Sequence, residues 1–559
     1  MEHSAVELHG VGVGSGVAVG PVVLMAEPQP EPRELTHAGD TAGEQAAVTA
    51  AVTTVAAELH DRAARAEGAG KALIEAAIQM AQDPMLADDV TARITAGTTG
   101  ERAVFEAFRS FQQQLIALGG VMAERAPDLG DVAQRIIAAL RGEPVASVPE
   151  SDTPFILVAR NLAPADTALL DLSKVLGLIT REGGPTSHTA ILARAKGIPA
   201  IVGVGHDAAL AEGTRVVLDA ASGVVTVDPN DAQVADAEKR VSAAAAGATA
   251  PITDGVLADG RKIPLLANLG SPREAAAAVA LGAEGVGLFR TEFLFLGAPI
   301  APTVADQQQQ YSELLSHFPG KKVVVRVLDA GADKPLAFLN DAHEENPALG
   351  VRGLRALREK QHILTDQLQA LKNSQDETDA SGNPAELWVM APMVADASET
   401  RFFVDYAKKL GLKTVGVMAE VPSLALVADQ VLEIADFVSI GTNDLTQYTL
   451  AADRMLGTVA TYQDPWHPAV LRLVKMLGDA GAAVGKPVGI CGEAAADSQL
   501  AVVLVGLGAT TLSMTPAALA SVRAELAGVT LEQARAKAAA ALAADSAVGA
   551  RAAAAAAAA

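Results

Sequence analysis

The sequence contains one cysteine, few aromatic residues and an excess of acidic over basic side chains. One cysteine in 559 residues excludes an internal disulfide bond and favours a reducing, cytoplasmic setting. Aromatic residues make up only 3% of the chain, so its cores must be built from alanine, valine and leucine. The formal net charge of -23 disfavours nucleic acid and anionic membranes as partners and favours a basic protein partner.

Targeting and membrane signals are also missing from the sequence. The N-terminus, MEHSAVELHG, lacks the basic segment that opens a secretory signal peptide. Residues 498–522 carry no charge and are long enough to span a bilayer. Because glycine, threonine, serine and proline interrupt this stretch, we expect a buried helix followed by a buried strand, and no membrane insertion.

The first 240 residues combine strand-like and helical patterns. Residues 34–142 show the apolar spacing of helices. Strand-like runs lie on both sides of this region, at 7–25, 155–160, 175–180, 200–204 and 215–220. We therefore expect an α/β domain formed by residues 1–33 and 143–240, with the helical region as a subdomain.

The remainder of the chain predicts a (β/α)8 barrel. Residues 241–255, rich in alanine, glycine and proline, are interpreted as a linker. Within 256–532 helical stretches separate eight strand candidates, at 264–269, 285–290, 322–327, 387–393, 414–420, 437–441, 487–491 and 510–514. The alanine-rich tail, 533–559, offers no apolar face to bury, and we assign it no function.

Polar residues follow these strands, at the end of the barrel where chemistry takes place. They are Asn268, Arg290, Arg326, Glu420, Asn443, Asp444 and Cys491. Two carboxylates from adjacent strands suit Mg²⁺, which keeps several waters and takes substrate oxygens. Arginines offer bidentate forks to phosphate and carboxylate, and Arg454 could supply a third. The pattern favours a small phosphorylated acid as substrate.

Some of these residues have equally simple structural explanations. An arginine at a strand end is as often part of an ion pair at the rim as a ligand of a substrate. Cys491 suits either proton transfer or a small buried apolar position. His467, in DPWHPAV, is interpreted as structural.

The segment GGPTSHTAILAR, residues 183–194, presents His188 at the start of a helical run. Gly183, Gly184 and Pro185 suit a turn, and Thr186 or Ser187 suits a helix cap with free N–H groups that can hold a phosphate. Neutral imidazole is a good nucleophile, and its phosphoramidate is labile enough to pass the group on. The alternative is a capping turn with an incidental histidine.

Several motifs together resemble enzyme I of the bacterial sugar phosphotransferase system, the phosphoenolpyruvate–protein phosphotransferases, over nearly the whole chain. They are GVGSGVAVGP, TSHTAILAR, GVGLFRTEFLF, EENPALGVRGLR, SIGTNDLTQYTLAADR and GICGEAA. The resemblance implies a swivelling phosphohistidine α/β domain with a helical subdomain that docks the phosphocarrier HPr. It further implies a (β/α)8 barrel that binds phosphoenolpyruvate and forms a homodimer.

The resemblance also implies a role for each candidate residue. His188 would accept the phosphoryl group and pass it to HPr, and Cys491 would be the proton donor that yields pyruvate. Glu420 and Asp444 would hold Mg²⁺. The substrate would be bound by Arg290, Arg326, Asn443 and Arg454.

One position departs from the family pattern, and two alternatives remain. Many members carry GGRTSH, whereas Pro185 here removes a charge beside the histidine. Pyruvate phosphate dikinase and phosphoenolpyruvate synthase share both domains, but they need an ATP-grasp domain for which residues 1–150 leave no room. A regulatory paralogue with reduced turnover is the second alternative, and the intact set of candidate residues favours the enzyme.

Overall fold

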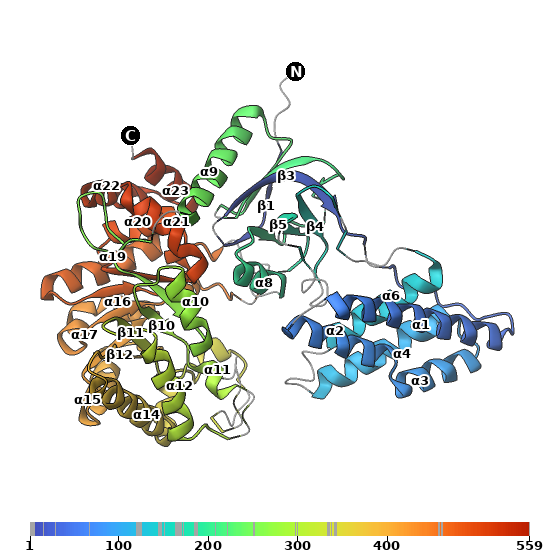
Figure 1. Ribbon diagram of the computed structural model, residues 1–559, viewed down its shortest axis with the longest axis horizontal. Coiled ribbons are helices and arrows are strands. Elements are labelled where there is room, and N and C mark those ends of the chain that lie inside the picture. Colours follow the sequence, from blue (N-terminus) through green and yellow to red (C-terminus); the bar gives the residue numbers. More distant parts are fainter. Residues whose placement is uncertain are drawn as a thin grey trace. The chain divides into compact units, whose positions relative to one another are not determined.

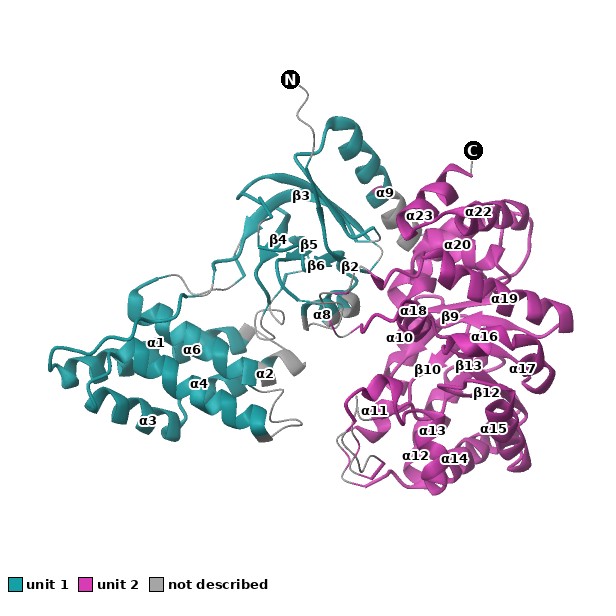
Figure 2. Ribbon diagram, turned by 180° about the vertical axis from the view of Figure 1, so that it is seen from behind, with its two compact units in different colours: residues 1–241 teal, residues 242–559 magenta. Residues whose placement is uncertain are grey.

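The structure is a computed structural model that forms two compact units, residues 1–241 and 242–559 (Figure 2). It describes residues 6–557 apart from 15, 28, 66–67, 119–125, 144–147, 150, 163–169, 172, 184–187, 207, 221, 250–251, 297, 299, 332–335, 337, 340–343, 455, 457–458 and 460–461. Each unit has its own core, as expected for a chain too long for one hydrophobic core.

The first unit contains an eight-stranded mixed sheet in the order β1-β8-β7-β3-β4-β5-β6-β2. Its strands are β1 (Val6–His9), β2 (Val11–Val13), β3 (Val17–Leu24), β4 (Phe155–Ala159), β5 (Val175–Thr180), β6 (Ala200–Val202), β7 (Arg215–Asp219) and β8 (Val224–Val227). The neighbours β3, β4, β5 and β6 run parallel. Helix α8 (His188–Lys196) lies between β5 and β6 in the chain, so it begins at the edge where these parallel strands end.

A helical bundle lies between β3 and β4 in the chain (Figure 1). It contains α1 (Thr41–Arg65), α2 (Gly68–Ala81), α3 (Pro84–Thr95), α4 (Gly100–Leu118) and α6 (Ala126–Arg141). Asp83 caps α3 by accepting hydrogen bonds from the amides of Met85 and Leu86. Apolar side chains such as Leu59, Ile74 and Ile136 form a core separate from those of the sheet. The predicted helical region is therefore a packed bundle.

The expected linker at 241–255 is in part helical. Helix α9 (Asp231–Thr249) continues through the first nine residues of this stretch. The composition was misleading because alanine, which leaves the segment without large apolar residues, is also the strongest helix former. The boundary between the two units, after Val241, thus falls inside a helix.

The second unit is a closed parallel barrel with the strands in chain order (Figure 1). All eight predicted strands form: β9 (Leu265–Leu269), β10 (Val286–Phe289), β11 (Lys322–Arg326), β12 (Glu386–Ala391), β13 (Thr414–Ala419), β14 (Val438–Ile440), β15 (Val488–Ile490) and β16 (Thr511–Met514). The described outer helices are α10 (Ala275–Ala280), α11 (Glu292–Phe295), α12 (Val304–Ser316), α13 (Leu354–Glu359), α14 (Gln361–Ala380), α15 (Ala397–Lys409), α16 (Pro422–Leu426), α17 (Ala428–Ile434), α18 (Thr442–Leu450), α19 (Pro468–Val484), α20 (Ser498–Gly506) and α21 (Leu519–Ala527).

The uncharged stretch at 498–522 forms α20, β16 and part of α21, all within the barrel. This confirms the expected buried helix followed by a buried strand. None of the helices in the described part of the chain is long and apolar enough to cross a membrane.

The alanine-rich tail packs on the barrel, contrary to our expectation. It forms α22 (Leu531–Ala543) and α23 (Ala547–Ala556), which bury Ala534, Ala538, Ala541, Ala550 and Ala554. A Cβ at Gly506 would lie 2.1 Å from the Ala534 carbonyl oxygen, so α20 and α22 approach closely. Alanine provides an apolar face here because the backbones are near enough for a methyl group to fill the space.

Candidate functional site

The strand-end residues lie at the carboxyl-terminal face of the barrel, as predicted. Arg326 is the last residue of β11, Arg290 follows β10, and Glu420 follows β13. Asp444 lies in the first turn of α18, and Cys491 follows β15. Because the strands are parallel and closed into a ring, their carboxyl ends share one face.

Arg326 is held by two buried carboxylates that the sequence analysis missed. Its Nη2 donates to Glu292, and its Nη1 lies 3.0 Å from Asp329 Oδ2. Burial works against the charged guanidinium, but these carboxylates hold the pKa of Arg326 above its ordinary value. Its Nε is buried and has no hydrogen-bond partner in the described part of the chain. This donor is therefore available to an additional acceptor.

Arg352 joins two carboxylates that are distant in sequence, and it too was missed. Its Nη2 lies 2.9 Å from Asp329 Oδ2, and its Nη1 lies 3.2 Å from Asp444 Oδ1. Nη1 also donates to Tyr448 at 3.2 Å. The only sequence signal was its place in the motif EENPALGVRGLR, whose glycines indicate a tight backbone path.

We expect Arg352→Met to destabilise the barrel by about 3–5 kcal/mol, because Asp329 and Asp444 each lose a buried ionic partner. Both tryptophans, Trp388 and Trp466, lie in the second unit, so their fluorescence during urea unfolding reports on the barrel. The matched control is Arg358→Met.

The control removes a more exposed pair, since Arg358 lies 3.6 Å from Glu399 and the two side chains are 47% and 15% exposed. Such pairs contribute about 0–1 kcal/mol. Equal stability of the Arg352→Met and Arg358→Met variants would show that the buried network does not stabilise the barrel.

Glu420 is buried beside the same network. Its Oε1 accepts a hydrogen bond from the Met393 amide at 2.6 Å. Its Oε2 faces Gly441, where a Cβ would come within 2.9 Å of it. Burial, followed by the charges of Asp444 and Asp329, raises the pKa of Glu420 well above its usual range. A cation at this position would favour the ionised carboxylate, and the missing Cβ leaves space beside the oxygen.

The described residues contain no cluster of three or more His, Cys, Asp and Glu side chains arranged to hold a metal ion. A cation held by Glu420 and Asp444 would take its other oxygens from water or substrate. This coordination is usual for Mg²⁺.

Cys491 is a buried thiol at the same face. Its Sγ lies 3.4 Å from the Ile440 carbonyl oxygen, which it can reach as a donor. Burial raises the pKa of Cys491 to about 11, so the thiol keeps its proton at neutral pH. The side chain of Asn268 donates to the Cys491 carbonyl at 3.0 Å and thereby fixes this turn.

The other polar candidates differ in how many protein contacts they make. Asn443 Oδ1 accepts from the Glu493 amide at 3.1 Å. Arg454 Nη1 lies 3.5 Å from Asp444 Oδ2. The Arg290 side chain is half-buried and makes no hydrogen bond or ion pair with a described residue. Burial raises the pKa of Cys491, and the charge of Arg290 partly offsets this rise, so the two groups interact electrostatically.

His188 is the first residue of α8 in the other unit. Residues 184–187, for which we predicted a turn and a cap, lie outside the described residues, and so does the His188 side chain. Gly183, just before them, has a φ of +98°, which suits glycine. His467 has the expected structural role, because its Nδ1 accepts a hydrogen bond from the Ala469 amide and caps α19.

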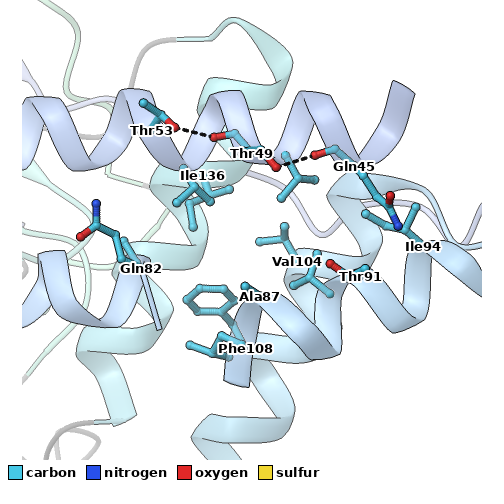
Figure 3. A pocket seen from close by; sticks show the side chains of 15 residues that line it. Gln45, Thr49, Thr53, Gln82, Ala87, Thr91, Ile94, Val104, Phe108 and Ile136 are labelled. Carbon is cyan, nitrogen blue, oxygen red and sulfur yellow. Dashed lines mark hydrogen bonds between the residues drawn. The ribbon is translucent and has the colours of Figure 1, made fainter. Parts of the chain in front are cut away.

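A cleft of about 480 Å³ in the helical bundle has a different character (Figure 3). Buried side chains, including those of Val104, Phe108 and Ile136, line its interior. Thr49 and Thr91 are among the exposed polar residues at its opening. No charged side chain is found among the described residues that line it. The cleft therefore does not suit a phosphate or carboxylate group, in contrast to the barrel face.

Comparisons with known proteins agree with this division of the chain. Family models of PEP-utilising enzymes match three consecutive parts: the N-terminal model residues 9–125, the mobile-domain model 151–223 and the PEP-binding-domain model 245–531. The phosphoenolpyruvate-protein phosphotransferase of Streptomyces coelicolor is 51% identical over 547 residues, which cover 97% of each chain. The chain belongs to the enzyme I family. This confirms the predicted family and fold.

Other members of the enzyme I family are similar over most of the chain. The phosphoenolpyruvate-protein phosphotransferase of Haloferax volcanii is 41% identical and covers 85% of each chain. That of Priestia megaterium is 36% identical and covers 93% of each. The mobile-domain match includes His188, and the PEP-binding-domain match includes every barrel residue discussed above.

Proposed function

We propose that the protein transfers the phosphoryl group of phosphoenolpyruvate to His188, with release of pyruvate, and then to a histidine of HPr. This is the first step of the sugar phosphotransferase system. The observation that carries the proposal is the buried network at the barrel face. Arginines and carboxylates are already positioned there, and Arg290 makes no contact with another described charge. Such preorganised charge suits a small, multiply anionic substrate.

Each candidate residue has a chemical task in this reaction. Arg290 and Arg326 bind phosphoenolpyruvate through bidentate contacts, and Asn443 and Arg454 bind near its phosphate. In-line attack by His188 forms the N–P bond as the bond between phosphorus and the enol oxygen breaks. The protonated thiol of Cys491 donates its proton to the methylene carbon of the enolate, which completes pyruvate.

Glu420 and Asp444 are the proposed ligands of Mg²⁺. Two features support a cation at this position. Gly441 leaves space beside Glu420 Oε2, and the negative charges of Asp444 and Asp329 lie near the Glu420 carboxylate. When bound, Mg²⁺ neutralises charge that develops on the substrate oxygens. Asp444 also contacts Arg352 and Arg454 and helps to keep them in place.

Two protein partners are part of the proposed function. HPr docks on the helical bundle, and the acidic net charge of the chain favours a basic partner. The barrel forms a homodimer, which is supported by large exposed apolar side chains in the helices and loops that follow the strands: Phe293, Ile300, Leu349, Leu426 and Tyr462. Transfer at contact distance requires the two units to approach and then separate. A cytoplasmic setting keeps Cys491 reduced.

The test is to offer the purified wild-type chain radiolabelled phosphoenolpyruvate or ATP, each with Mg²⁺. We expect an acid-labile, alkali-stable phosphohistidine from phosphoenolpyruvate, stoichiometric release of pyruvate, and passage of the label to HPr. Labelling from ATP would indicate a dikinase. Binding of phosphoenolpyruvate without phosphohistidine would indicate a regulatory paralogue.

A further inference from the structure

The carboxyl ends of β4, β5 and β6 meet at the edge of the first unit's sheet from which the chain continues to α8. Backbone hydrogen bonds extend beyond the strands at this edge. The amides of Arg181 and Glu182 donate to the carbonyls of Ala159 and Arg160, each at 3.0 Å, and the Gly205 amide donates to the Arg181 carbonyl at 3.0 Å. The segment after β5 is therefore held between the segments that leave its two neighbours.

Glu182 joins the same three strand ends through its side chain. Its Oε1 accepts hydrogen bonds from Arg160 Nε at 2.9 Å and from His206 Nε2 at 2.7 Å. Arg160 directly follows β4, and His206 lies beyond β6. Burial opposes ionisation, but the bonds from Arg160 and His206 lower the pKa of Glu182 below its ordinary value. One ionised carboxylate thus bridges both neighbours of β5.

Other charged groups at this edge extend the network. Arg181 Nη1 donates to the carbonyls of His206 and Ala208, at 2.9 and 3.1 Å. Its Nε lies 3.8 Å from Glu27 Oε1. The His206 segment is therefore held from two sides, by the carboxylate of Glu182 and by the guanidinium of Arg181.

The residue that follows Glu182 packs closely against the segment beyond β6. Gly183 adopts a φ of +98°, and Gly203, beyond β6, has a φ of +74°. A Cβ at Gly203 would lie 2.9 Å from the Gly183 carbonyl oxygen, so the two segments approach closely. The backbone at Gly183, directly after Glu182, is therefore packed against the segment that leaves β6.

We propose that Glu182 is a positioning residue for phosphoryl transfer at His188. By joining Arg160 and His206 it holds the segment after β5 in place, six residues before the acceptor histidine. This role rests on the proposed function. In-line transfer requires the acceptor nitrogen at contact distance, and a displacement of 1 Å can cost about 10²-fold in rate.

A purely stabilising surface interaction makes a different prediction. Arg160, Glu182 and His206 are 46%, 40% and 58% exposed. Exposed ion pairs contribute about 0–1 kcal/mol to stability. If that were their only role, removing Glu182 would lower the melting temperature slightly and leave the rate of phosphorylation unchanged.

The experiment measures single-turnover phosphorylation of His188 in the full-length chain by rapid quench with labelled phosphoenolpyruvate. We expect Glu182→Ala to lower the rate constant about 10- to 100-fold without changing the KM for phosphoenolpyruvate, because the barrel residues are untouched. Transfer from phosphorylated HPr falls by the same factor, since the acceptor is the same. Glu182→Gln, which keeps an acceptor oxygen at equal reach, recovers most of the rate.

The matched control is Glu238→Ala. Glu238 Oε1 lies 2.9 Å from Arg215 Nη2, with similar exposure, but it joins no strand ends beside α8. Equal rates for Glu182→Ala and Glu238→Ala would overturn the positioning role, and so would a loss confined to KM. If Glu182→Ala does not fold, Arg160→Ala and His206→Ala each remove one of the two hydrogen bonds to Glu182. Wild-type rates of phosphorylation in both of these variants would also overturn the positioning role.

Phosphorylation of the wild-type chain separates a failure of the proposed function from a failure of the positioning role. If wild type forms no phosphohistidine, the proposed function fails. If wild type is labelled and Glu182→Ala is labelled equally fast, only the positioning role fails.

Discussion

The His188→Ala variant should take up no phosphoryl group from phosphoenolpyruvate, whereas the wild-type chain is labelled. The reason is chemical: alanine has no nucleophile, and covalent transfer needs an atom to which the phosphorus can bind. The measurement is acid-labile label after incubation with phosphoenolpyruvate and Mg²⁺, together with release of pyruvate. Both should be lost entirely.

The fold should survive this substitution. His188 is the first residue of α8, and alanine is the strongest helix former, so the helix retains its backbone hydrogen bonds. Circular dichroism melting should therefore match wild type. His60→Ala is the control, because His60 is an exposed histidine in the same unit that makes one side-chain contact, to the Ala56 carbonyl. A phosphohistidine in the His188→Ala variant would assign the acceptor to a different residue.

The barrel could be predicted because its signal is local and repeated. Each strand is a short apolar run between polar turns, and parallel strands buried on both faces produce that pattern regardless of their neighbours. The linker expected over part of α9, and the expectation that the tail, α22 and α23, has no apolar face to bury, were wrong because alanine is ambiguous in a sequence. It lacks a large apolar side chain to mark a buried face, and only the close approach of α20 to Ala534 shows that a methyl group is sufficient.

The candidate site was predicted only in part, for a related reason. Residues such as Arg326 and Asp444 could be identified because they follow a predicted strand within a recognisable motif. This signal did not identify Arg352, whose partner Asp444 lies 92 residues away and is brought near only when the barrel closes. Glu182 and His206 likewise meet across 24 residues, through the pairing of β5 with β6. Interactions between distant segments depend on the register of paired strands and on the closure of the barrel, and local sequence patterns do not specify either.

Replacing either proposed metal ligand should separate the two half-reactions. We expect Glu420→Gln and Asp444→Asn to lower phosphorylation by phosphoenolpyruvate about 100-fold or more, since a metal ion contributes several kcal/mol of transition-state stabilisation. Transfer from phosphorylated HPr to His188 should continue at the wild-type rate, because in the proposed function both the HPr-docking bundle and His188 belong to the first unit. Calorimetric titration with Mg²⁺ and phosphoenolpyruvate should show weaker binding.

The amide substitutions keep the shape of each side chain and remove the carboxylate that would bind the cation. Their effect on folding is followed by tryptophan fluorescence of the barrel, because Asp444 also contacts Arg352 and Arg454. The control is Glu433→Gln, at an exposed position on α17. If both half-reactions slow together in well-folded Glu420→Gln and Asp444→Asn variants, these carboxylates act on more than the phosphoenolpyruvate step. If neither slows, the metal does not bind between them, and their burial serves the arginine network alone.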